Sequence, residues 1–298
     1  VIDEAQRVSE IGLTLKRITD NFTNVQLLVT GSSSFELQSN LSEPLTGRKY
    51  EYHLYPISTA ELYDSQGLLP VKQMFESRLI YGSYPDIINH TDEAKELLMN
   101  IANSYLYKDL LAMNEIRRPI LLEKLLIALA LQVGSEVSYN EVAQTIGTDN
   151  KTVEKYIDLL EKCYVIFRLN AFNRNLRTEL KKSKKIYFYD NGIRNAVIQN
   201  FAPLSLRQDT GALWENFFIS ERIKANHYNG NYAKSFFWRT TQQQEIDYIE
   251  EADGNFTAFE MKWNPNKRPI TFPSPFLNNY PVKETVVITP ENYLEWVM

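Results

Sequence analysis

Cysteine is almost missing from this sequence: Cys163 is the single one among 298 residues. One cysteine cannot close an internal disulfide or supply a thiolate metal cluster, and such usage is typical of a reducing cytoplasm. Histidine is scarce too, and the three present, His53, His90 and His227, are not spaced as zinc ligands. The composition therefore argues against a disulfide-stapled secreted protein and against a zinc enzyme.

Long apolar runs and an excess of one charge are also missing. The longest strongly apolar run, 125–131, is far shorter than the ~20 residues of a membrane helix, and the chain does not open with a signal-peptide pattern. A net charge of −5, from 32 Lys and Arg against 37 Asp and Glu, excludes a basic nucleic-acid coat but not a local basic patch. We expect a soluble, cytoplasmic, globular protein of two or three domains.

The first pattern that is present is strand, helix, strand. Val1 and Ile2 precede Asp3 and Glu4, an amphipathic helical segment follows, and the apolar run 25–30 ends in Gly-Ser-Ser-Ser. This order predicts a parallel α/β sheet with polar residues at the carboxyl ends of its strands. Because strands usually run about 5–6 residues, the two-residue stub also predicts that part of the sheet precedes it.

This first segment resembles AAA-type P-loop ATPases. Val-Ile-Asp-Glu-Ala is similar to their Walker B segment, and Thr-Gly-Ser-Ser to their sensor 1 turn. The resemblance implies that Asp3 helps to hold Mg²⁺, that Glu4 orients the attacking water, and that Ser32 contacts the phosphate or that water. It also implies that Arg48, in Leu-Thr-Gly-Arg, stabilises charge at the nucleotide edge. ATP and Mg²⁺ are thus the expected cofactors of the intact protein.

The glycine-rich phosphate loop of such ATPases is not found. The pattern G-x-x-x-x-G-K-[ST] occurs nowhere in the sequence, and none of the 11 glycines is followed by lysine. We therefore expect an ATPase ancestry, but weak ATP binding or none by these 298 residues themselves. The helical stretch that follows carries Tyr-Gly-Ser-Tyr-Pro and Tyr-Leu-Tyr-Lys-Asp-Leu, which resemble segments behind the ATPase core in one bacterial and archaeal AAA group.

Three helical patterns and a strand come next. An apolar stripe in the first helix, a capping box between Ser138 and Glu141 at the second, and a third helix before the strand resemble a winged helix-turn-helix. The resemblance makes the third helix the reader of a DNA groove, with Lys151 and Lys155 exposed on it. Because acidic side chains alternate with these lysines, a structural or protein-contacting role stays equally open.

One basic cluster follows that strand, at Lys181, Lys182, Lys184 and Lys185. Within a wing these side chains would lie along a phosphate backbone. A solvated loop between strands is the alternative, and it is the interpretation we prefer.

The C-terminal region holds a predicted hairpin with an acidic face. Asp-Gly at 253–254 is a favoured two-residue turn, and with that turn at the centre Asp247 lies opposite Glu260. Glu245 then lies opposite Lys262 on the same face. Two opposed carboxylates repel each other unless a cation lies between them. The other face would carry an apolar stripe: Ile246, Tyr248, Phe259, Met261 and Trp263.

Asp followed by Glu-x-Lys on adjoining strands is similar to the PD-(D/E)XK nucleases, and Glu260-Met261-Lys262 matches the second half of that motif. The resemblance implies that Asp247 and Glu260 hold Mg²⁺ or Mn²⁺, whose bound water loses a proton more readily. It implies that Lys262 positions this water, and that Glu215 on the preceding helix is the supporting acid. The alternative is an amphipathic hairpin whose polar face is simply solvated.

Together these patterns predict an α/β protein in four regions. They are the C-terminal part of an AAA-type ATPase core (1–62), a helical connector (63–115), a winged helix-turn-helix (116–172) and a PD-(D/E)XK nuclease-like α/β domain (173–298). The preferred function is an AAA-type ATPase with a nuclease-like C-terminal domain, inactive as an ATPase in this form. The alternatives are a Mg²⁺-dependent DNA or RNA endonuclease using Asp247, Glu260 and Lys262, and a non-enzymatic module that binds DNA or a protein partner. Each is compatible with an oligomer, and none involves a membrane.

Overall fold

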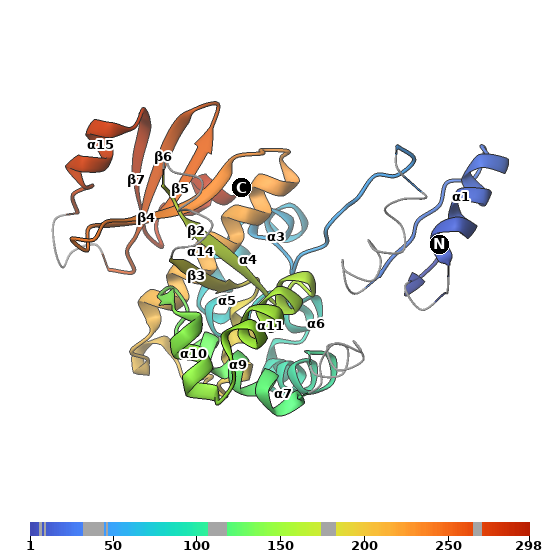
Figure 1. The fold of residues 1–298 in the computed structure, drawn as a ribbon, viewed down its shortest axis with the longest axis horizontal. Helices are drawn as coiled ribbons and strands as arrows, with labels where there is room; N and C mark the ends of the chain where they lie inside the picture. The colour runs from blue at the N-terminus through green and yellow to red at the C-terminus, as the bar shows by residue number, and fades with distance from the viewer. Residues whose placement is uncertain are drawn as a thin grey trace.

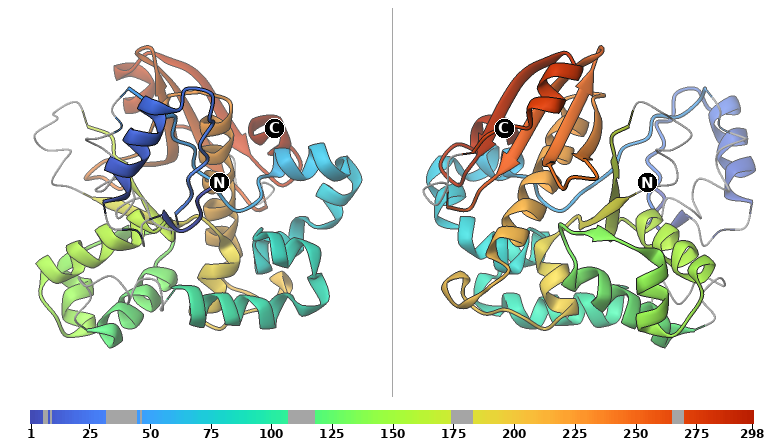
Figure 2. Two further views of the ribbon diagram at one scale, coloured as in Figure 1. Left: turned by 90° about the vertical axis from the view of Figure 1, so that its right-hand side faces the viewer. Right: turned by 60° about the vertical axis from the view of Figure 1, so that its left-hand side comes forward.

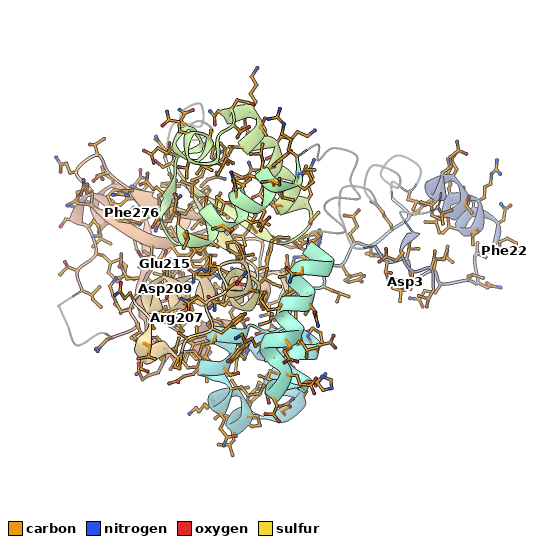
Figure 3. The ribbon with its side chains drawn as sticks, turned by 90° about the horizontal axis from the view of Figure 1, so that it is seen from below. Asp3, Phe22, Arg207, Asp209, Glu215 and Phe276 are labelled. Carbon is orange, nitrogen blue, oxygen red and sulfur yellow. The ribbon has the colours of Figure 1, made fainter. Side chains whose placement is uncertain are left out.

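The computed structural model describes residues 1–5, 8, 10–31, 45, 47–106, 118–173, 183–264 and 270–298. Figure 1 shows an N-terminal segment that lies apart from a larger body and is joined to it by an extended stretch. Asp3 lies in the N-terminal segment and Glu215 lies inside the body, as Figure 3 shows from below. The residues predicted for the two kinds of chemistry therefore belong to separate parts of the molecule.

The N-terminal segment consists of helix α1 (Ile11–Asn21) and two extended stretches that pair in parallel. Ile2 forms a parallel bridge with Val29, and the amide of Thr30 donates to the carbonyl oxygen of Ile2 at 2.9 Å. The predicted strand–helix–strand order is present, although the strand expected over 25–30 is reduced to a bridge. A small apolar cluster holds the parts together: Ala5, Ile11, Leu15 and Leu45 are buried against Ile2, Leu27 and Val29.

Short helices form the connector between this segment and the sheet. The first begins with a capping box, because the Ser58 hydroxyl accepts from the Glu61 amide while the Glu61 carboxylate accepts from the Ser58 amide. The turn after α5 needs Gly82, whose φ is 75° and where a Cβ would lie 2.0 Å from an oxygen of Asp190. The elements are α3 (Thr59–Gln66), α4 (Leu68–Gln73), α5 (Phe75–Tyr81), α6 (Pro85–Asn89), η2 (Thr91–Glu93), α7 (Ala94–Asn100) and η3 (Ile101–Leu106).

The next stretch has the predicted succession of three helices and a strand. The Ser138 hydroxyl accepts from the Glu141 amide at the start of the second helix, as the capping pattern predicts. The predicted stripe on the first helix, Leu122, Leu125, Leu126 and Leu129, is fully buried. The elements are α9 (Pro119–Leu131), β1 (Glu136–Val137), α10 (Tyr139–Ile146), α11 (Asn150–Lys162), β2 (Ile166–Ala171) and β3 (Lys184–Phe188).

One mixed sheet runs through the body, and among the described residues it has seven strands in the order β1-β3-β2-β4-β5-β6-β7. Pairing is parallel between β2 and β4 and between β6 and β7, and antiparallel elsewhere. The predicted α/β class is confirmed. Because β2 pairs with β4, the sheet continues across the predicted boundary at 172–173, and the division into four regions stays a prediction. The remaining strands are β4 (Lys234–Arg239), β5 (Glu245–Ala252), β6 (Asn255–Met261) and β7 (Val282–Ile288).

Helix α14 (Thr210–Tyr228) joins the sheet to the connector. It contacts β3 and β6 of the sheet and α5 of the connector, and Figure 2 shows it running through the middle of the body. Trp214 and Phe218 of this helix are completely buried in the large apolar core. Among the described helices, none has the length and apolar character needed to cross a bilayer. The other helices are α13 (Asn191–Val197), η4 (Leu204–Leu206), α15 (Ser274–Asn279) and α16 (Leu294–Val297).

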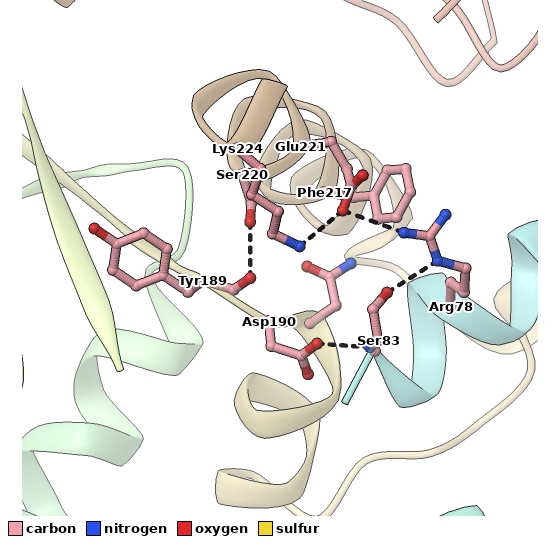
Figure 4. Close-up of a pocket in the computed structure, with 10 residues that line it drawn as sticks. Arg78, Ser83, Tyr189, Asp190, Phe217, Ser220, Glu221 and Lys224 are labelled. Atoms are coloured by element: carbon pink, nitrogen blue, oxygen red, sulfur yellow. Dashed lines mark hydrogen bonds and ion pairs between the residues drawn. The ribbon is translucent and has the colours of Figure 1, made fainter. Parts of the chain in front are cut away.

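A buried ionic network fixes α14 against the connector (Figure 4). The Glu221 carboxylate lies 3.2 Å from the Arg78 guanidinium of α5 and 2.8 Å from the Lys224 ammonium. Its second oxygen accepts from the Thr59 amide at 2.6 Å, at the start of α3. Burial alone would raise the pKa of Glu221, but the two cations outweigh it and lower the pKa to about 2. Three elements are thus joined by one charged side chain.

We expect Glu221→Gln to destabilise the protein by about 3–5 kcal/mol at pH 7, because Arg78 and Lys224 then remain buried without their counter-charge. The pKa of the carboxyl group falls from an ordinary 4.5 to about 2 on folding, so its contribution is complete above pH 4.5 and is lost as the pH falls toward 2. Urea unfolding at pH 7 and pH 3 measures both effects, with exposed Glu284→Gln on β7 as the matched control. Equal stability of Glu221→Gln and the wild type at pH 7 would contradict this assignment.

Candidate functional site

The β5–β6 hairpin has the predicted register over most of its length. Its turn lies at Asp253 and Gly254, both with positive φ, and the pairs run from Ala252 opposite Asn255 to Tyr248 opposite Phe259. The Asp-Gly signal therefore located the turn and the pairing correctly. The predicted opposition of Asp247 and Glu260 lies one step beyond the last of these pairs.

A bulge in β5 changes the geometry at that step. Phe236 of β4 pairs with Ile249 and Trp238 with Ile246, so β5 has one more residue than β4 between these pairs, at Asp247 and Tyr248. Bulges of this kind turn side chains at the edges of sites. Here the Asp247 carboxylate accepts a hydrogen bond from the Met261 amide at 3.0 Å.

The bulge also corrects the predicted apolar stripe. Tyr248 and Phe259 pack in the large core, with Met261 among them and Trp263 against them. Ile246 packs instead in a second cluster, with Ile249. The prediction that Ile246 shares a face with Tyr248 is wrong, because the additional residue breaks the two-residue alternation of the strand.

Four carboxylates and two lysines form what we call the carboxylate cluster: Glu215, Glu245, Asp247, Glu260, Lys185 and Lys262. The Lys262 ammonium lies 2.9 Å from Glu260 and 3.8 Å from Asp247. These three residues come from β5, from β6 and from the residue directly after β6. The structure thus brings together the side chains that the Asp and Glu-x-Lys pattern predicted.

Glu215 enters the carboxylate cluster from α14 and Glu245 from the start of β5. The Lys185 ammonium on β3 bridges them, at 3.3 Å from Glu215 and 2.5 Å from Glu245. The Tyr187 hydroxyl donates to the same Glu215 oxygen at 2.6 Å. Arg239 of β4 lies 3.7 Å from Glu245 and 2.7 Å from Glu136 on β1, which extends the charged network to the sheet edge.

The electrostatics of the cluster raise the pKa values of two carboxyl groups. Burial and the neighbouring Asp247 charge raise the pKa of Glu260 to about 7, although Lys262 opposes them. Burial, opposed by Lys185 and aided by Asp247, raises the pKa of Glu215 to about 7. Burial would lower the pKa of Lys185, but the surrounding carboxylates outweigh it and raise that pKa above its usual range. Such a set of perturbed groups is typical of functional sites.

The carboxylate oxygens of the cluster suit a hard cation that takes few of its ligands from the protein. In the part of the chain that the structure describes, no group of three His, Cys, Asp or Glu side chains has metal-binding geometry. Asp247 and Glu260 supply two carboxylates. Mg²⁺ is commonly bound by one or two carboxylates and completes its shell with water and phosphate oxygens. The residues present fit an ion of that kind, provided that Lys262 moves aside.

The residues predicted for nucleotide chemistry lie in the N-terminal segment. The Thr30 hydroxyl donates to the Asp3 carboxylate, which places the ends of the two paired stretches side by side. Glu4 follows with a positive φ of 52°. Arg48 pairs with Asp20 of α1 at 2.9 Å. Ser32 lies outside the described residues.

The lysines predicted to contact nucleic acid separate into three groups. Lys151 and Lys155 are exposed on α11, as expected. Lys181 and Lys182 lie outside the described residues. Lys184 lies over the Tyr139 ring, and Lys185 is buried in the carboxylate cluster.

The sequence interpretation names Lys185 only as a candidate nucleic-acid contact, and it misses that Lys185 and Tyr187 belong to the carboxylate cluster. A signal for them exists: they are two apart in a strand, on either side of the apolar Ile186, so their side chains share one face. A lysine beside a tyrosine on the buried face of a strand requires an acidic partner. The sequence could not show that Glu215 is that partner.

Comparison with known proteins supports an ATPase-related N-terminal segment. A model described as an AAA domain matches residues 1–63, and two domains of unknown function, DUF8612 and DUF4143, match residues 72–204 and 210–295. An uncharacterized protein of Haemophilus influenzae is 28% identical over 66% of this chain and 52% of its own length. Uncharacterized proteins of Mycobacterium tuberculosis and Methanocaldococcus jannaschii are 26% and 23% identical over 88% and 83% of this chain.

The chain covers just over half the length of these relatives, 52%, 58% and 57% in the same order. No solved structure matches it.

We expect Glu260→Gln to stabilise the protein at pH 8 by about 1–3 kcal/mol. The folded chain holds this proton up to a pKa of about 7 against an ordinary 4.5, so ionisation costs stability as the pH rises from 4.5 through 7. The gain should therefore be smaller at pH 5 than at pH 8. Urea unfolding at the two pH values measures it, and Glu251→Gln on the same hairpin should show neither the gain nor its pH dependence. A loss of stability at pH 8 would contradict the prediction.

Proposed function

We propose that the C-terminal part of this chain cleaves phosphodiester bonds of nucleic acid with the help of a divalent metal ion. The observation that carries this proposal is the meeting of Asp247, Glu260 and Lys262 at the ends of two paired strands, with Glu215 beside them. Two ionisable carboxyl groups with raised pKa values next to a third carboxylate destabilise a fold. Proteins accept such a cost in stability mainly at functional sites, so we take this cluster to be one.

Asp247 and Glu260 are the residues that would hold Mg²⁺ or Mn²⁺. The bound ion would supply an acidified water and neutralise charge on the phosphate. The Lys262 ammonium, which now lies against both carboxylates, would move aside for the ion and from beside it orient that water or meet the phosphate. Glu215 is the proton acceptor in this scheme, because its pKa of about 7 allows it to take and release a proton near neutral pH.

Nucleic acid is the proposed substrate because of the elements next to the cluster. The β2–β3 pair follows the three helices α9, α10 and α11, and β1 pairs with β3. This order of elements is typical of a winged helix. Lys151 and Lys155 are exposed on α11, the helix that would face a groove. β3 of this same unit carries Lys185 into the carboxylate cluster, so a strand bound along α11 would lie on the unit that completes the site.

We expect Asp247→Asn to lower Mn²⁺-dependent cleavage of labelled DNA or RNA by at least about 100-fold, because it removes one of two metal-binding carboxylates. The measurement compares cleavage rates on single- and double-stranded substrates. Asp253→Asn at the hairpin turn makes the same chemical change on an exposed residue and should retain the wild-type rate. Cleavage that survives Asp247→Asn, or that is missing from the wild type with Mn²⁺, would overturn the proposal.

We propose as a second function that the N-terminal segment contributes to an ATPase site. The AAA-domain match and the pairing of Thr30 with Asp3 support it, because the carboxyl ends of parallel strands are where such sites form. Asp3 would then hold Mg²⁺ of the nucleotide and Glu4 would orient water.

This second proposal predicts weak nucleotide binding by the 298 residues alone, because no phosphate-loop motif occurs in them. We expect no saturable MgATP binding below a Kd on the order of 1 mM by isothermal titration calorimetry. Asp3→Asn should leave the titration unchanged. Micromolar binding that is lost in Asp3→Asn would show that these residues already form a complete nucleotide site.

A further inference from the structure

The carboxylate cluster includes a strand that does not belong to the hairpin. Lys185 and Tyr187 lie on β3, which is separated from β5 in the sheet by β2 and β4. Their side chains nevertheless reach the cluster, at 3.3 Å and 2.6 Å from the same oxygen of Glu215. Both are buried. The site is therefore built from two separate strand pairs and one helix.

The same strand also fixes the helix that carries Glu215. The Asn216 side chain, next in sequence, accepts from the Phe188 amide at 2.8 Å and donates to the Phe188 carbonyl at 3.0 Å. Asn216 is fully buried, so water does not compete for these hydrogen bonds. The backbone of β3 thus sets the position of α14 at Glu215, while its side chains set the direction of the carboxylate.

The contacts among the described residues orient Glu215 but engage only one of its two carboxylate oxygens. Lys185 and Tyr187 both bind Oε1, and the Glu215 side chain keeps 16% of its surface exposed. A carboxylate held through one oxygen leaves the other available to water or to a ligand in the site.

We propose that Lys185 and Tyr187 are positioning residues of the site, which hold the Glu215 carboxylate toward Asp247 and Glu260. The inference rests on the proposed phosphodiesterase function, in which Glu215 accepts a proton. In this proposal the β2–β3 pair, which follows α11, contributes side chains that the site requires. A shift of that strand pair when nucleic acid binds would then be transmitted directly to Glu215.

A double-mutant cycle between Tyr187→Phe and Glu215→Ala tests this directly. Tyr187→Phe removes one hydrogen bond and keeps the ring, and we expect it to lower kcat about 10-fold with little change in KM for nucleic acid. In the Glu215→Ala background the same change should alter kcat less than about twofold, because Tyr187 acts through Glu215. Tyr293→Phe is the control, since it removes a buried hydroxyl that has no hydrogen-bond partner among the described residues. It should behave as the wild type.

The four proteins of the cycle and the Tyr293→Phe control are also titrated with Mn²⁺ alone by electron paramagnetic resonance, so that the outcome does not depend on cleavage. If the effects of Tyr187→Phe and Glu215→Ala on kcat are non-additive, the positioning role is supported. If the wild type binds Mn²⁺ without cleaving, non-additive effects on the Mn²⁺ Kd support it instead. Additive effects in a wild type that cleaves overturn the positioning role and leave the proposed function intact. A wild type that neither binds Mn²⁺ nor cleaves overturns both.

Discussion

The burial of charged side chains on α14 is the constraint on which the body of this protein depends. A carboxylate taken out of water costs several kcal/mol unless cations and hydrogen-bond donors surround it. Glu221 obtains them from α5, from its own helix and from the start of α3, and Glu215 obtains them from β3. Apart from Lys224, these partners come from elements distant in sequence, so the charges of α14 are satisfied only when the connector and the β2–β3 pair are in place. Local parts of the fold are therefore coupled through a single helix.

The two carboxylates on α14 have opposite electrostatic outcomes, and only one of them stabilises the fold near neutral pH. Glu221 faces two cations and one amide, and its pKa is lowered, which is the behaviour of a group that stabilises the folded chain. Glu215 faces Lys185 but also the charge of Asp247, and its pKa is raised, as is that of Glu260. The surroundings of Glu221 stabilise the folded chain, whereas those of Glu215 make it less stable near neutral pH. Unequal treatment of similar groups is how proteins prepare acids and bases for a reaction.

The N-terminal segment and the carboxylate cluster belong to separate parts of the molecule, joined by an extended stretch (Figure 1). The polypeptide is tied down again where the Ile57 amide donates to the Ser83 carbonyl at 2.8 Å and where Thr59 donates to Glu221. Tyr55, two residues before the first of these points, packs against Tyr189 and Tyr228. A movement of the N-terminal segment would thus reach the body at α3 and at the end of α14, on the helix that also carries Glu215.

The sequence by itself determined the local features, because these depend on neighbouring residues. The Asp-Gly turn set the hairpin register from Ala252 to Tyr248, the stripe of leucines set the buried face of α9, and the Asp and Glu-x-Lys pattern indicated which acids would meet. Tertiary structure alone decided the bulge at Asp247, because the additional residue is defined by the pairing of β5 with β4 and not by the hairpin itself. It also decided the place of Lys185, which the sequence put in a solvated basic loop and the structure puts between Glu215 and Glu245. A lysine can be buried only where carboxylates from other elements offset the loss of water, and sequence spacing carries no information about which elements those are.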